Sequence, residues 1–380
     1  MTLKPFNILL LSSYGSLKGG GQESFFQLVT NLDERIFHSY VALPTEGGLA
    51  KKLRVHGIEV TVLELPKIMN LQIQRNCKAL YRLLKLSNQY KLDLIHTDGP
   101  RNTFYAGLVA KIRRIPLVWH VRASNRDRYD RLLYHLSSRI ILVANSIKSR
   151  FDWIEKSNKF VTIYNGIDLS EFRSNTPAMS IRKQYGINDK SIVIAVIARI
   201  ERLKGQKDLI EACERLKNTI KDFHILLVGE IADLPYFKEC KDKAKEVAIQ
   251  ERIIFTGYQD QEGISHILNE IDIFVLPSLF EAFPRSLIEA MGAGKPVVAT
   301  DVGGCREAVE DRVSGFIVPA GSPRDLAERI DMLAMDSELR VMVGKNARMR
   351  AERMFSIEHN VKQTEQLYLK AIMGNQYDIP

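Results

Sequence analysis

Short apolar runs alternate with amphipathic helical patterns along this 380-residue chain, and this alternation limits the possible folds more than any other feature. Such alternation predicts parallel sheets whose strands are joined by crossover helices. With 45% hydrophobic residues, the chain is long enough for two α/β domains of ordinary size. We expect strands at residues 6–11, 38–43, 59–63, 92–96, 117–120, 139–145, 160–164, 192–197, 224–228, 253–256, 273–276 and 297–300.

The stretch Pro277–Val298, PSLFEAFPRSLIEAMGAGKPVV, reads as a turn, a helix and the start of a strand. Ligands of doubly wound sheets bind beside the carboxyl ends of the strands, where this turn is expected. Glu281 lies in the turn and Glu289 on the helix. Pro284 suits the first helical turn, whose free N–H groups form an anion site. Carboxylates beside an anion site suit hydrogen bonds to ribose or sugar hydroxyls, although two glutamates at this spacing are also typical of a solvated surface.

Residues 281–304, EAFPRSLIEAMGAGKPVVATDVGG, resemble the E-x7-E signature of the retaining nucleotide-sugar glycosyltransferases of family 4. The resemblance covers nearly the whole chain. It implies the α/β GT-B architecture, in which two facing Rossmann-like domains have parallel sheets and a C-terminal helix crosses back to the first domain. It implies an acceptor-binding domain over residues 1–172, completed by helix 357–380, and a nucleotide-sugar donor-binding domain over residues 173–356, with a linker near residues 168–176.

Two cations follow the strand expected at residues 192–197 and precede a helix that starts near Gln206. Arg199 offers a fork of donors and Lys204 a point charge, a combination that suits a diphosphate. Taken alone, such a pair is also typical of a solvated face. The Arg-x4-Lys-Gly pattern of the family matches Arg199, Lys204 and Gly205.

The resemblance implies roles for particular residues of the second domain. Glu289 is expected to bind the ribose and Glu281 a hydroxyl of the donor sugar, and the loop at Gly257 and Tyr258 is expected to hold the base. Pro284 has no N–H, so we expect diphosphate contacts from Phe283, Arg285 or Ser286. The catalytic residues implied are Glu281, His120, Arg199 and Lys204, and the donor site implied is Gly20, Gly21, Arg199, Lys204, Gly257, Tyr258, Glu281, Phe283, Arg285, Ser286 and Glu289.

A glycine-rich loop, SSYGSLKGGGQES, follows the first expected strand. Glycines let the backbone pass close to a ligand, and simple turn glycines are the alternative. The loop is not G-x-G-x-x-G, and no acidic residue ends the next strand, which argues against a nicotinamide-dependent enzyme. It resembles the Gly-Gly-x-Glu loop of the family, with Gly20, Gly21 and Glu23 in the matching positions.

Two histidines lie at the ends of successive expected strands in the first half of the chain. LIHTD resembles the His-x-His strand end of the family, with Asp98 in place of the second histidine. We therefore expect acceptor contacts from His96, Asp98 and Arg122. His120, in VWHVR, matches the histidine that approaches the transferred sugar in the family. The alternative for either histidine is a hydrogen-bonded structural role.

Basic residues are concentrated in the first half of the chain. Residues 1–170 hold 25 Lys and Arg against 13 Asp and Glu, a charge of +12, which leaves 29 against 32, or −3, for the remainder. Such a surface suits nucleic acid, anionic lipid headgroups or a pyrophosphate-linked acceptor, with a functionless basic surface as the alternative. Amphipathic helices expected at 75–86, 103–113 and 126–139 suit an anionic membrane surface or simple packing on the sheet.

Several classes of site have no signature in the sequence. The four cysteines lack metal-binding spacing, which suits a reducing cytosol and argues against structural zinc. We find no Asp-x-Asp pair, so we expect a metal-independent enzyme without a cofactor. No nucleic-acid motif is present, and neither a signal peptide nor a membrane-spanning run is recognised. We expect a cytoplasmic protein, or one peripheral on the inner face of the membrane.

The resemblance to family 4, together with these patterns, implies a retaining hexosyltransferase. We expect transfer from a nucleoside-diphosphate sugar, with a UDP-sugar favoured, to a hydroxyl of a lipid-linked or cell-envelope saccharide. The alternatives are a sugar-nucleotide epimerase or a phosphorylase with the same architecture, and a non-catalytic protein that binds nucleotide-sugars.

Overall fold

The computed structural model describes residues 4–17, 19–67, 73–172 and 180–374, which form two compact units. Unit 1 comprises residues 1–166 and 357–380, and unit 2 comprises residues 167–356. The first boundary therefore precedes the expected one at residue 172. Ile167 belongs to unit 2 because its N–H donates to the carbonyl of Phe355 at 2.9 Å. Of the expected linker, residues 173–176 lie outside the described residues, as do residues 375–380 of the expected last helix.

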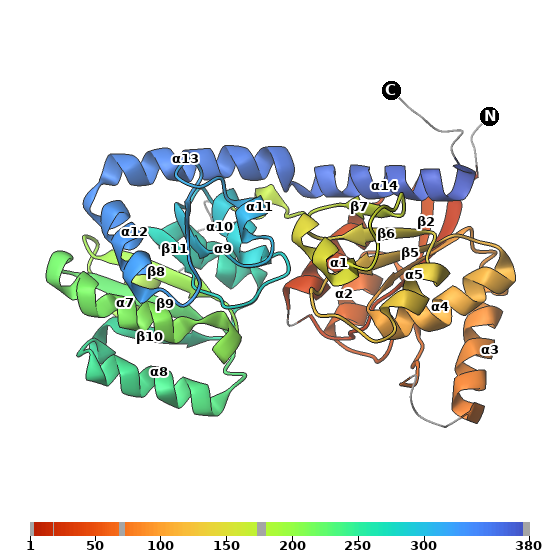
Figure 1. The fold of residues 1–380 in the computed structure, drawn as a ribbon, viewed down its shortest axis with the longest axis horizontal. Helices are drawn as coiled ribbons and strands as arrows, with labels where there is room; N and C mark the ends of the chain where they lie inside the picture. The colour runs from red at the N-terminus through yellow and green to blue at the C-terminus, as the bar shows by residue number, and fades with distance from the viewer. Residues whose placement is uncertain (1–3, 18, 68–72, 173–179, 375–380) are drawn as a thin grey trace. The chain divides into compact units, whose positions relative to one another are not determined.

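Unit 1 contains a seven-stranded parallel sheet with helices on both faces (Figure 1). The strand order is β3-β2-β1-β4-β5-β6-β7, so the direction of chain progression reverses between β1 and β4. The strands are β1 Phe6–Leu11, β2 Phe37–Leu43, β3 Glu59–Val62, β4 Leu94–Asp98, β5 Leu117–Val121, β6 Arg139–Leu142 and β7 Phe160–Thr162. The helices are α1 Gly20–Asn31, α2 Gly48–Val55, α3 Ile73–Gln89, α4 Pro100–Arg113, α5 Asp130–Leu136, the 3-10 helix η1 Asn145–Phe151, and α14 Ile357–Met373.

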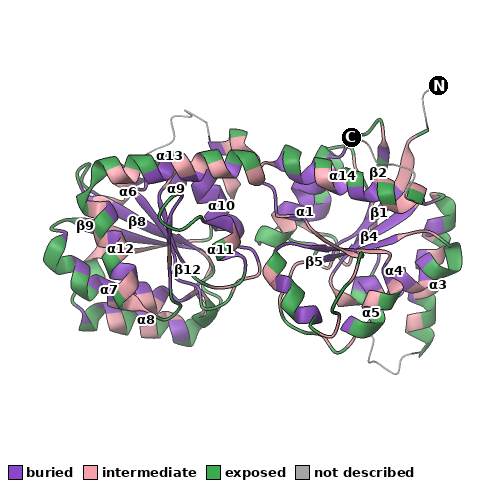
Figure 2. Ribbon diagram, turned by 45° about the horizontal axis from the view of Figure 1, so that its top comes forward, coloured by how far each residue is buried: buried purple, intermediate pink, exposed green. Residues whose placement is uncertain are grey.

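Alternating residues of the strands of unit 1 serve two separate core layers. Leu10 and Leu94 pack with residues of α1, α2 and α14, whereas Leu9 and Ile95 pack with residues of α3 and α4. Both faces of the sheet are covered, which explains why its strands read as continuous apolar runs. Figure 2 shows the strands as buried, whereas the exposed residues lie on the outward sides of the helices.

Two expected elements of unit 1 are shorter in the structure than in the sequence analysis. The helix expected at 126–139 is confined to α5, because Asp127 accepts from the backbone N–H of Tyr129 and holds the preceding residues in a turn. The strand expected at 139–145 ends at Leu142 and leads into η1. Hydrogen bonds from nearby backbone N–H groups to an Asp side chain often compete with helix formation. Here the bond to Asp127 outweighs the helical pattern at the start of the expected helix.

A buried ion pair joins α5 to η1. The guanidinium of Arg150 donates from Nε and Nη2 to the two carboxylate oxygens of Asp130, at 2.9 and 2.6 Å, and from Nη1 to the carbonyl of Ala123. The two side chains are only 4% and 5% exposed. Such a bidentate pair fixes the geometry of the elements that carry it.

Unit 2 contains a six-stranded parallel sheet of order β10-β9-β8-β11-β12-β13, again with helices on both faces. Its reversal of strand order lies between β8 and β11. The strands are β8 Ile192–Ile197, β9 Phe223–Val228, β10 Ile253–Gly257, β11 Ile273–Leu276, β12 Val297–Thr300 and β13 Phe316–Val318. The helices are α6 Ile181–Tyr185, α7 Gln206–Thr219, α8 Leu234–Glu246, α9 Gln261–Glu270, α10 Arg285–Gly292, α11 Cys305–Ala308, α12 Pro323–Met335 and α13 Ser337–Met354, with 3-10 helices η2 Leu169–Phe172, η3 Arg202–Lys204 and η4 Gln250–Arg252.

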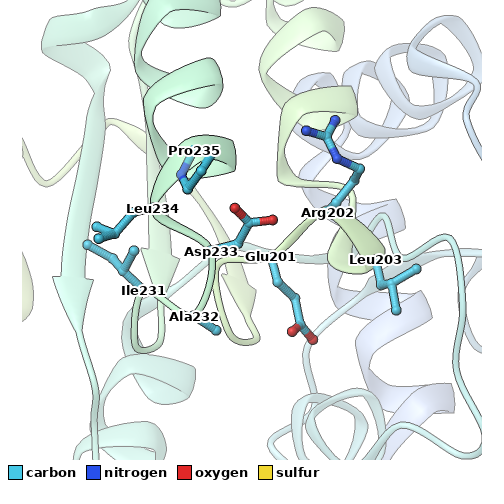
Figure 3. Close-up of a pocket in the computed structure, with 8 residues that line it drawn as sticks. All are labelled: Glu201, Arg202, Leu203, Ile231, Ala232, Asp233, Leu234 and Pro235. Carbon is cyan, nitrogen blue, oxygen red and sulfur yellow. The ribbon is translucent and has the colours of Figure 1, made fainter.

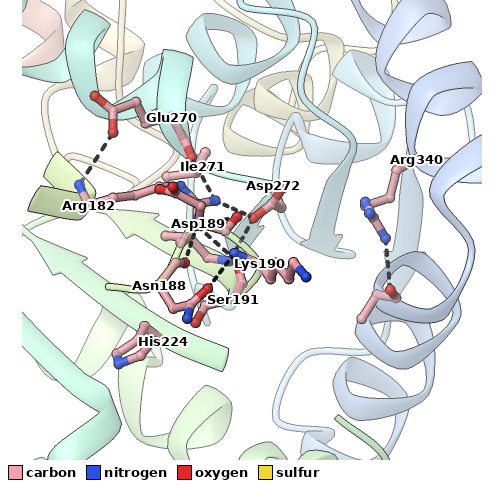
Figure 4. Close-up of polar contacts among 12 residues, drawn as sticks. Arg182, Asn188, Asp189, Lys190, Ser191, His224, Glu270, Ile271, Asp272 and Arg340 are labelled. Atoms are coloured by element: carbon pink, nitrogen blue, oxygen red, sulfur yellow. Dashed lines mark hydrogen bonds and ion pairs between the residues drawn. The ribbon is translucent and has the colours of Figure 1, made fainter. Parts of the chain in front are cut away.

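Arg182 on α6 ties together the segments that enter the central strands of unit 2 (Figure 4). Its guanidinium donates to the carboxylate of Asp272 at 2.9 Å and to the carbonyl of Ser191 at 3.0 Å. Asp272 also accepts from the backbone N–H of Val193 at 2.8 Å. This cluster lies at the amino ends of β8 and β11. It is therefore at the opposite edge of the sheet from the carboxyl ends of these strands, where ligands of such sheets bind.

The ion pair of unit 1 yields a stability prediction. Replacing Asp130 with Asn leaves the guanidinium of Arg150 buried without its counter-charge, which costs about 3–5 kcal/mol. Both tryptophans, Trp119 and Trp153, belong to unit 1, so the urea midpoint of tryptophan fluorescence reports this unit. We expect a large fall in that midpoint for Asp130→Asn, and no comparable change for Arg35→Ala, which removes an exposed pair. Equal midpoints would show that the buried pair does not stabilise unit 1.

Candidate active site

The reversals of strand order in the two sheets bring most of the expected site residues to two places. In unit 2, Arg199 and Lys204 follow β8 and Glu281 follows its neighbour β11. In unit 1, the glycine-rich loop follows β1, and His96 and Asp98 lie on its neighbour β4. The crevice at such a reversal is the usual ligand site of open α/β sheets.

Lys204 and Glu281 form an ion pair across the reversal in unit 2. The ammonium of Lys204 lies 2.8 Å from Oε1 of Glu281, and the hydroxyl of Ser278 donates to the same oxygen at 2.7 Å. Both charged side chains are largely shielded from solvent. The carboxylate therefore has a fixed position, and a cation lies directly beside it.

Two glycines allow the loop that carries Glu281 to pack against neighbouring backbone. Gly205 has a φ of +64°, and a Cβ there would lie 2.0 Å from the carbonyl oxygen of Pro277. Gly303 has a φ of +50°, and a Cβ there would lie 1.9 Å from the carbonyl oxygen of Glu281. No side chain fits either position, so both glycines are required by the shape of this loop.

Glu289 is nearly buried on α10 and is held by two neighbours. Nε of Arg285 donates to its carboxylate at 2.7 Å, and the amide of Gln261 on α9 donates at 3.3 Å. The same amide donates to Glu171 at 2.8 Å. Glu289 and Glu281 are therefore in separate clusters of hydrogen bonds, and sequence reasoning missed Gln261 and Glu171 because they lie on other elements.

The first turn of α10 can offer backbone N–H groups to an anion. The ring of Phe283 packs against Phe355, with centroids 5.5 Å apart, and the guanidinium of Arg285 is used on Glu289. Phe283 precedes α10, and Ser286 follows Arg285 in its first turn. The N–H groups of a first helical turn have no carbonyl partner within the helix, which suits the contact expected from Ser286.

Arg199 and Tyr258 are more exposed than the ion pair. Arg199 donates to the carboxylate of Glu201 at 2.8 Å, and its carbonyl accepts from Gln206 at 2.8 Å. Tyr258 follows Gly257 at the end of β10 and is 49% exposed. Since β9 separates β10 from β8, this tyrosine is not on a strand adjacent to the reversal.

A pocket of about 600 Å³ opens between the loops that follow β8 and β9 (Figure 3). Glu201 lines the pocket, and its carboxylate accepts a hydrogen bond from Arg199. The expected donor residues are not among the lining residues, and sequence reasoning did not single out the β9 loop. The residues that line the pocket are Glu201, Arg202, Leu203, Ile231, Ala232, Asp233, Leu234 and Pro235.

In unit 1, the carboxylate of Asp98 is used to hold the loop that follows β1. It accepts from the backbone N–H of Ser13 at 2.6 Å, and the hydroxyl of Ser13 donates to the carbonyl of Asp98. Burial raises the pKa of this carboxyl. Farther along the same loop, Gly20 and Gly21 begin α1, and a Cβ on Gly21 would meet nothing within 4 Å. Packing among the described residues therefore does not require a glycine at position 21.

His96 and His120 are buried beside each other on β4 and β5. Their ring centroids are 5.3 Å apart and their planes meet at 77°. The hydroxyl of Tyr368 on α14 lies 2.7 Å from Nδ1 of His96, and Nη2 of Arg122 lies 3.3 Å from Nδ1 of His120. Burial, with the nearby charge of Arg122, lowers the pKa of His96 to about 3 and the pKa of His120 well below its usual range. Both rings are therefore neutral.

Among the described residues, no three His, Cys, Asp or Glu side chains come together in an arrangement that could hold a metal ion.

The neutral histidines give unit 1 a specific dependence on pH. An unfolded histidine has a pKa of about 6.5 and a folded His96 of about 3, so the unfolded chain binds more protons between these values. The free energy of unfolding should therefore fall by about 1.4 kcal/mol per pH unit per buried histidine below pH 6.5. We expect His96→Gln to lose less stability than the wild type between pH 6.5 and 5, as followed by tryptophan fluorescence in urea. Identical slopes would refute a neutral His96.

Two protein-family profiles match the chain. The profile described as "Glycosyltransferase Family 4" matches residues 18–171, and the profile described as "Glycosyl transferases group 1" matches residues 179–350. Together they cover most of both units. The chain belongs to the glycosyltransferases of family 4, and its two Rossmann-like α/β units are those of the GT-B fold.

Individual relatives agree with this assignment. The chain is 27% identical to the N,N'-diacetylbacillosaminyl-diphospho-undecaprenol alpha-1,3-N-acetylgalactosaminyltransferase of Campylobacter jejuni, over 90% of this chain and 93% of the relative. It is 23% identical to the UDP-Gal:alpha-D-GlcNAc-diphosphoundecaprenol alpha-1,3-galactosyltransferase of Escherichia coli, over 80% and 82%. The crystal structure of Anabaena Alr3699/HepE in complex with UDP-glucose matches with a TM-score of 0.80 and 25% identity, over 95% of this chain and 99% of that one.

Proposed function

We propose that this protein is a retaining, metal-independent glycosyltransferase that moves a sugar from a UDP-sugar to a hydroxyl of a lipid-linked saccharide during the synthesis of a cell-envelope polysaccharide. The observation that carries the proposal is the ion pair of Lys204 and Glu281 at the reversal of strand order in unit 2. It puts a cation for a diphosphate and an acceptor for a sugar hydroxyl side by side, where the fold binds ligands.

The chemistry proposed depends on charge. Departure of the nucleoside diphosphate leaves negative charge on its oxygens, and preformed donors stabilise that charge in the transition state. Lys204, Arg199 and the first N–H groups of α10 are such donors, so the reaction does not need a divalent cation. Glu281 orients a sugar hydroxyl and does not form a covalent bond. The proton of the acceptor hydroxyl passes to the departing phosphate, which is the reaction mode that the family resemblance implies.

The choice of substrates rests on the relatives. The Campylobacter and Escherichia coli enzymes are named for acceptors with a diphospho-undecaprenol anchor, and the Escherichia coli enzyme is named for UDP-galactose. The Anabaena protein holds UDP-glucose. We therefore propose a UDP-sugar as donor and a polyprenyl-diphosphate saccharide as acceptor for this chain.

Donor turnover tests the proposal. Purified protein is incubated with UDP-, GDP- and ADP-sugars in the presence of EDTA, and nucleotide release is followed. We expect slow hydrolysis of one UDP-sugar, and a loss on the order of 10²-fold in kcat for Lys204→Ala because a donor to the developing charge is removed. Glu289→Gln should also lose turnover.

Lys207→Ala provides the matched control for Lys204→Ala. Lys207 lies three positions later, on α7, where it pairs loosely with Glu211 at 4.0 Å and has no expected part in the site. It should retain wild-type turnover. A requirement for added metal would contradict the metal-independent mechanism, and binding of no nucleotide-sugar at all would favour a non-catalytic protein.

A basic and partly apolar face of unit 1 supports the proposal that the protein works at the inner face of a membrane. Helices α3, α4 and α5 lie beside one another, and Tyr81 and Ile112 on the first two are 66% and 60% exposed. No helix among the described residues is both long enough and apolar enough to cross a bilayer. An interfacial contact needs only such exposed apolar side chains beside cations. The exposed basic residues of α3 and α4 include Arg75, Lys78, Arg82, Lys85, Lys111 and Arg113.

Liposome sedimentation tests this face. We expect the wild type to sediment with vesicles that contain anionic lipid, and Lys78→Glu with Lys85→Glu to reduce the bound fraction at low ionic strength, because each cation near an anionic surface contributes about 1 kcal/mol. The control is Lys238→Glu with Lys245→Glu, which reverses two exposed lysines with the same spacing on α8 of unit 2. Equal effects of the two pairs would contradict a membrane face on α3.

A further inference from the structure

Two histidines and a tyrosine interrupt an apolar layer of unit 1. His96, His120 and Tyr368 lie among residues such as Leu10, Leu94 and Val118, between the sheet and α14, and each is at most 2% exposed. The rings of His96 and Tyr368 are 5.7 Å apart, and those of His96 and His120 are 5.3 Å apart. The three rings form a continuous row from α14 to β5.

The hydrogen bond to Tyr368 selects the tautomer of His96. A tyrosine hydroxyl has one proton, and a neutral imidazole has one N–H. If Tyr368 donates to Nδ1, the proton of His96 is on Nε2, and this N–H is the one group of the pair that has no partner among the described residues. If Nδ1–H donates instead, both the hydroxyl proton and the lone pair of Nε2 lack partners. The first arrangement leaves fewer buried groups unsatisfied and is favoured.

Arg122 selects the same tautomer for His120. A guanidinium has no lone pair to accept a hydrogen bond, so the contact at 3.3 Å requires Nδ1 of His120 to be the acceptor. The proton of His120 is then on Nε2, which is buried and also has no partner within the described part of the chain. Both histidines therefore carry an N–H donor for which the described residues supply no acceptor.

We propose that Tyr368 is a positioning residue for sugar transfer, which fixes His96 as the Nε2–H tautomer and, through the contact between the two rings, holds His120 so that its Nε2–H can donate to a substrate oxygen. The identity of that substrate as a sugar rests on the proposed function. His120 is the last residue but one of β5, near the carboxyl edge of the sheet, whereas His96 has no exposed surface. His96 therefore acts through its neighbour.

A purely structural role would be served better by donors with partners inside the protein. Tyr105 shows the alternative within the same unit, because it is equally buried, on the opposite face of the sheet, and its hydroxyl donates to Asn76 at 3.1 Å. Buried donors without partners reduce stability, and a ligand at this site could supply the missing acceptor. A neutral imidazole also suits a hydroxyl oxygen, because it donates without acting as an acid.

The tautomers are tested by nuclear magnetic resonance of the full-length protein labelled with 15N in histidine. The signals of His96 are assigned from their loss in His96→Gln. We expect the wild-type spectrum to show protonation at Nε2 and not at Nδ1, unchanged from pH 7.5 to 5.5. In Tyr368→Phe we expect a shift of the tautomer signals of His96 and a smaller shift of those of His120. A wild-type His96 protonated at Nδ1 would overturn the proposal without any measurement of activity.

Kinetics of the same variants test the effect on catalysis, with Tyr105→Phe as the matched loss of a buried hydroxyl. We expect Tyr368→Phe to lower kcat on the order of tenfold with little change in the KM for the donor, because the loss is one of geometry. Tyr105→Phe should leave kcat and the spectrum of His120 unchanged. Equal kcat values for the two variants would refute the positioning role. Failure of the wild type to use any donor would refute the proposed function, while the tautomer measurement still decides the role of Tyr368.

Discussion

Close contact between backbone segments, made without side chains, holds the candidate donor site of unit 2 in shape. Gly205 and Gly303 lie where any Cβ would overlap a carbonyl oxygen, of Pro277 in one case and of Glu281 in the other. The loop after β11 is thus held between the loops after β8 and β12, and its glutamate meets Lys204. A larger residue at either glycine would displace the carboxylate, because the neighbour that it meets is main chain and cannot rotate away.

The ion pair that results from this packing also sets how the site can respond to a ligand. An unpaired ammonium or carboxylate in a shielded crevice would be costly, and each group lowers that cost for the other. A diphosphate that approaches Lys204 brings its own negative charge, so the lysine can keep Glu281 as one partner and gain another. The hydroxyl of Ser278 donates to the same carboxylate and gives Glu281 a second partner. The site is therefore prepared for an anion without a large rearrangement.

The sequence predicted the fold well, because alternating strands and helices admit few arrangements and each strand pattern is continuous. It also placed Lys204 and Glu281 after the ends of two strands that prove to be neighbours. The location of a site was therefore predictable, but the hydrogen bonds within it were not. It did not reveal the hydrogen bond between Tyr368 and His96, two residues that are 272 positions apart in the chain. It also did not reveal that Glu289 has a partner on another helix. Such contacts depend on helix rotation and strand register, which hydrophobic patterns fix only to within a residue or so. The roles of these residues remain predictions.

The two units carry opposite kinds of polar group, and the difference matches the chemistry proposed for them. Unit 2 presents permanent charges, which suit a diphosphate whose charge increases as the bond to the sugar breaks. Unit 1 presents imidazoles that Arg122 and burial keep neutral, as the lowered pKa of His96 indicates. A protonated histidine there would be repelled by Arg122 and would attract anions. A neutral imidazole donates to a hydroxyl oxygen without attracting an anion, so Arg122, by opposing protonation of His120, keeps this donor suited to a hydroxyl.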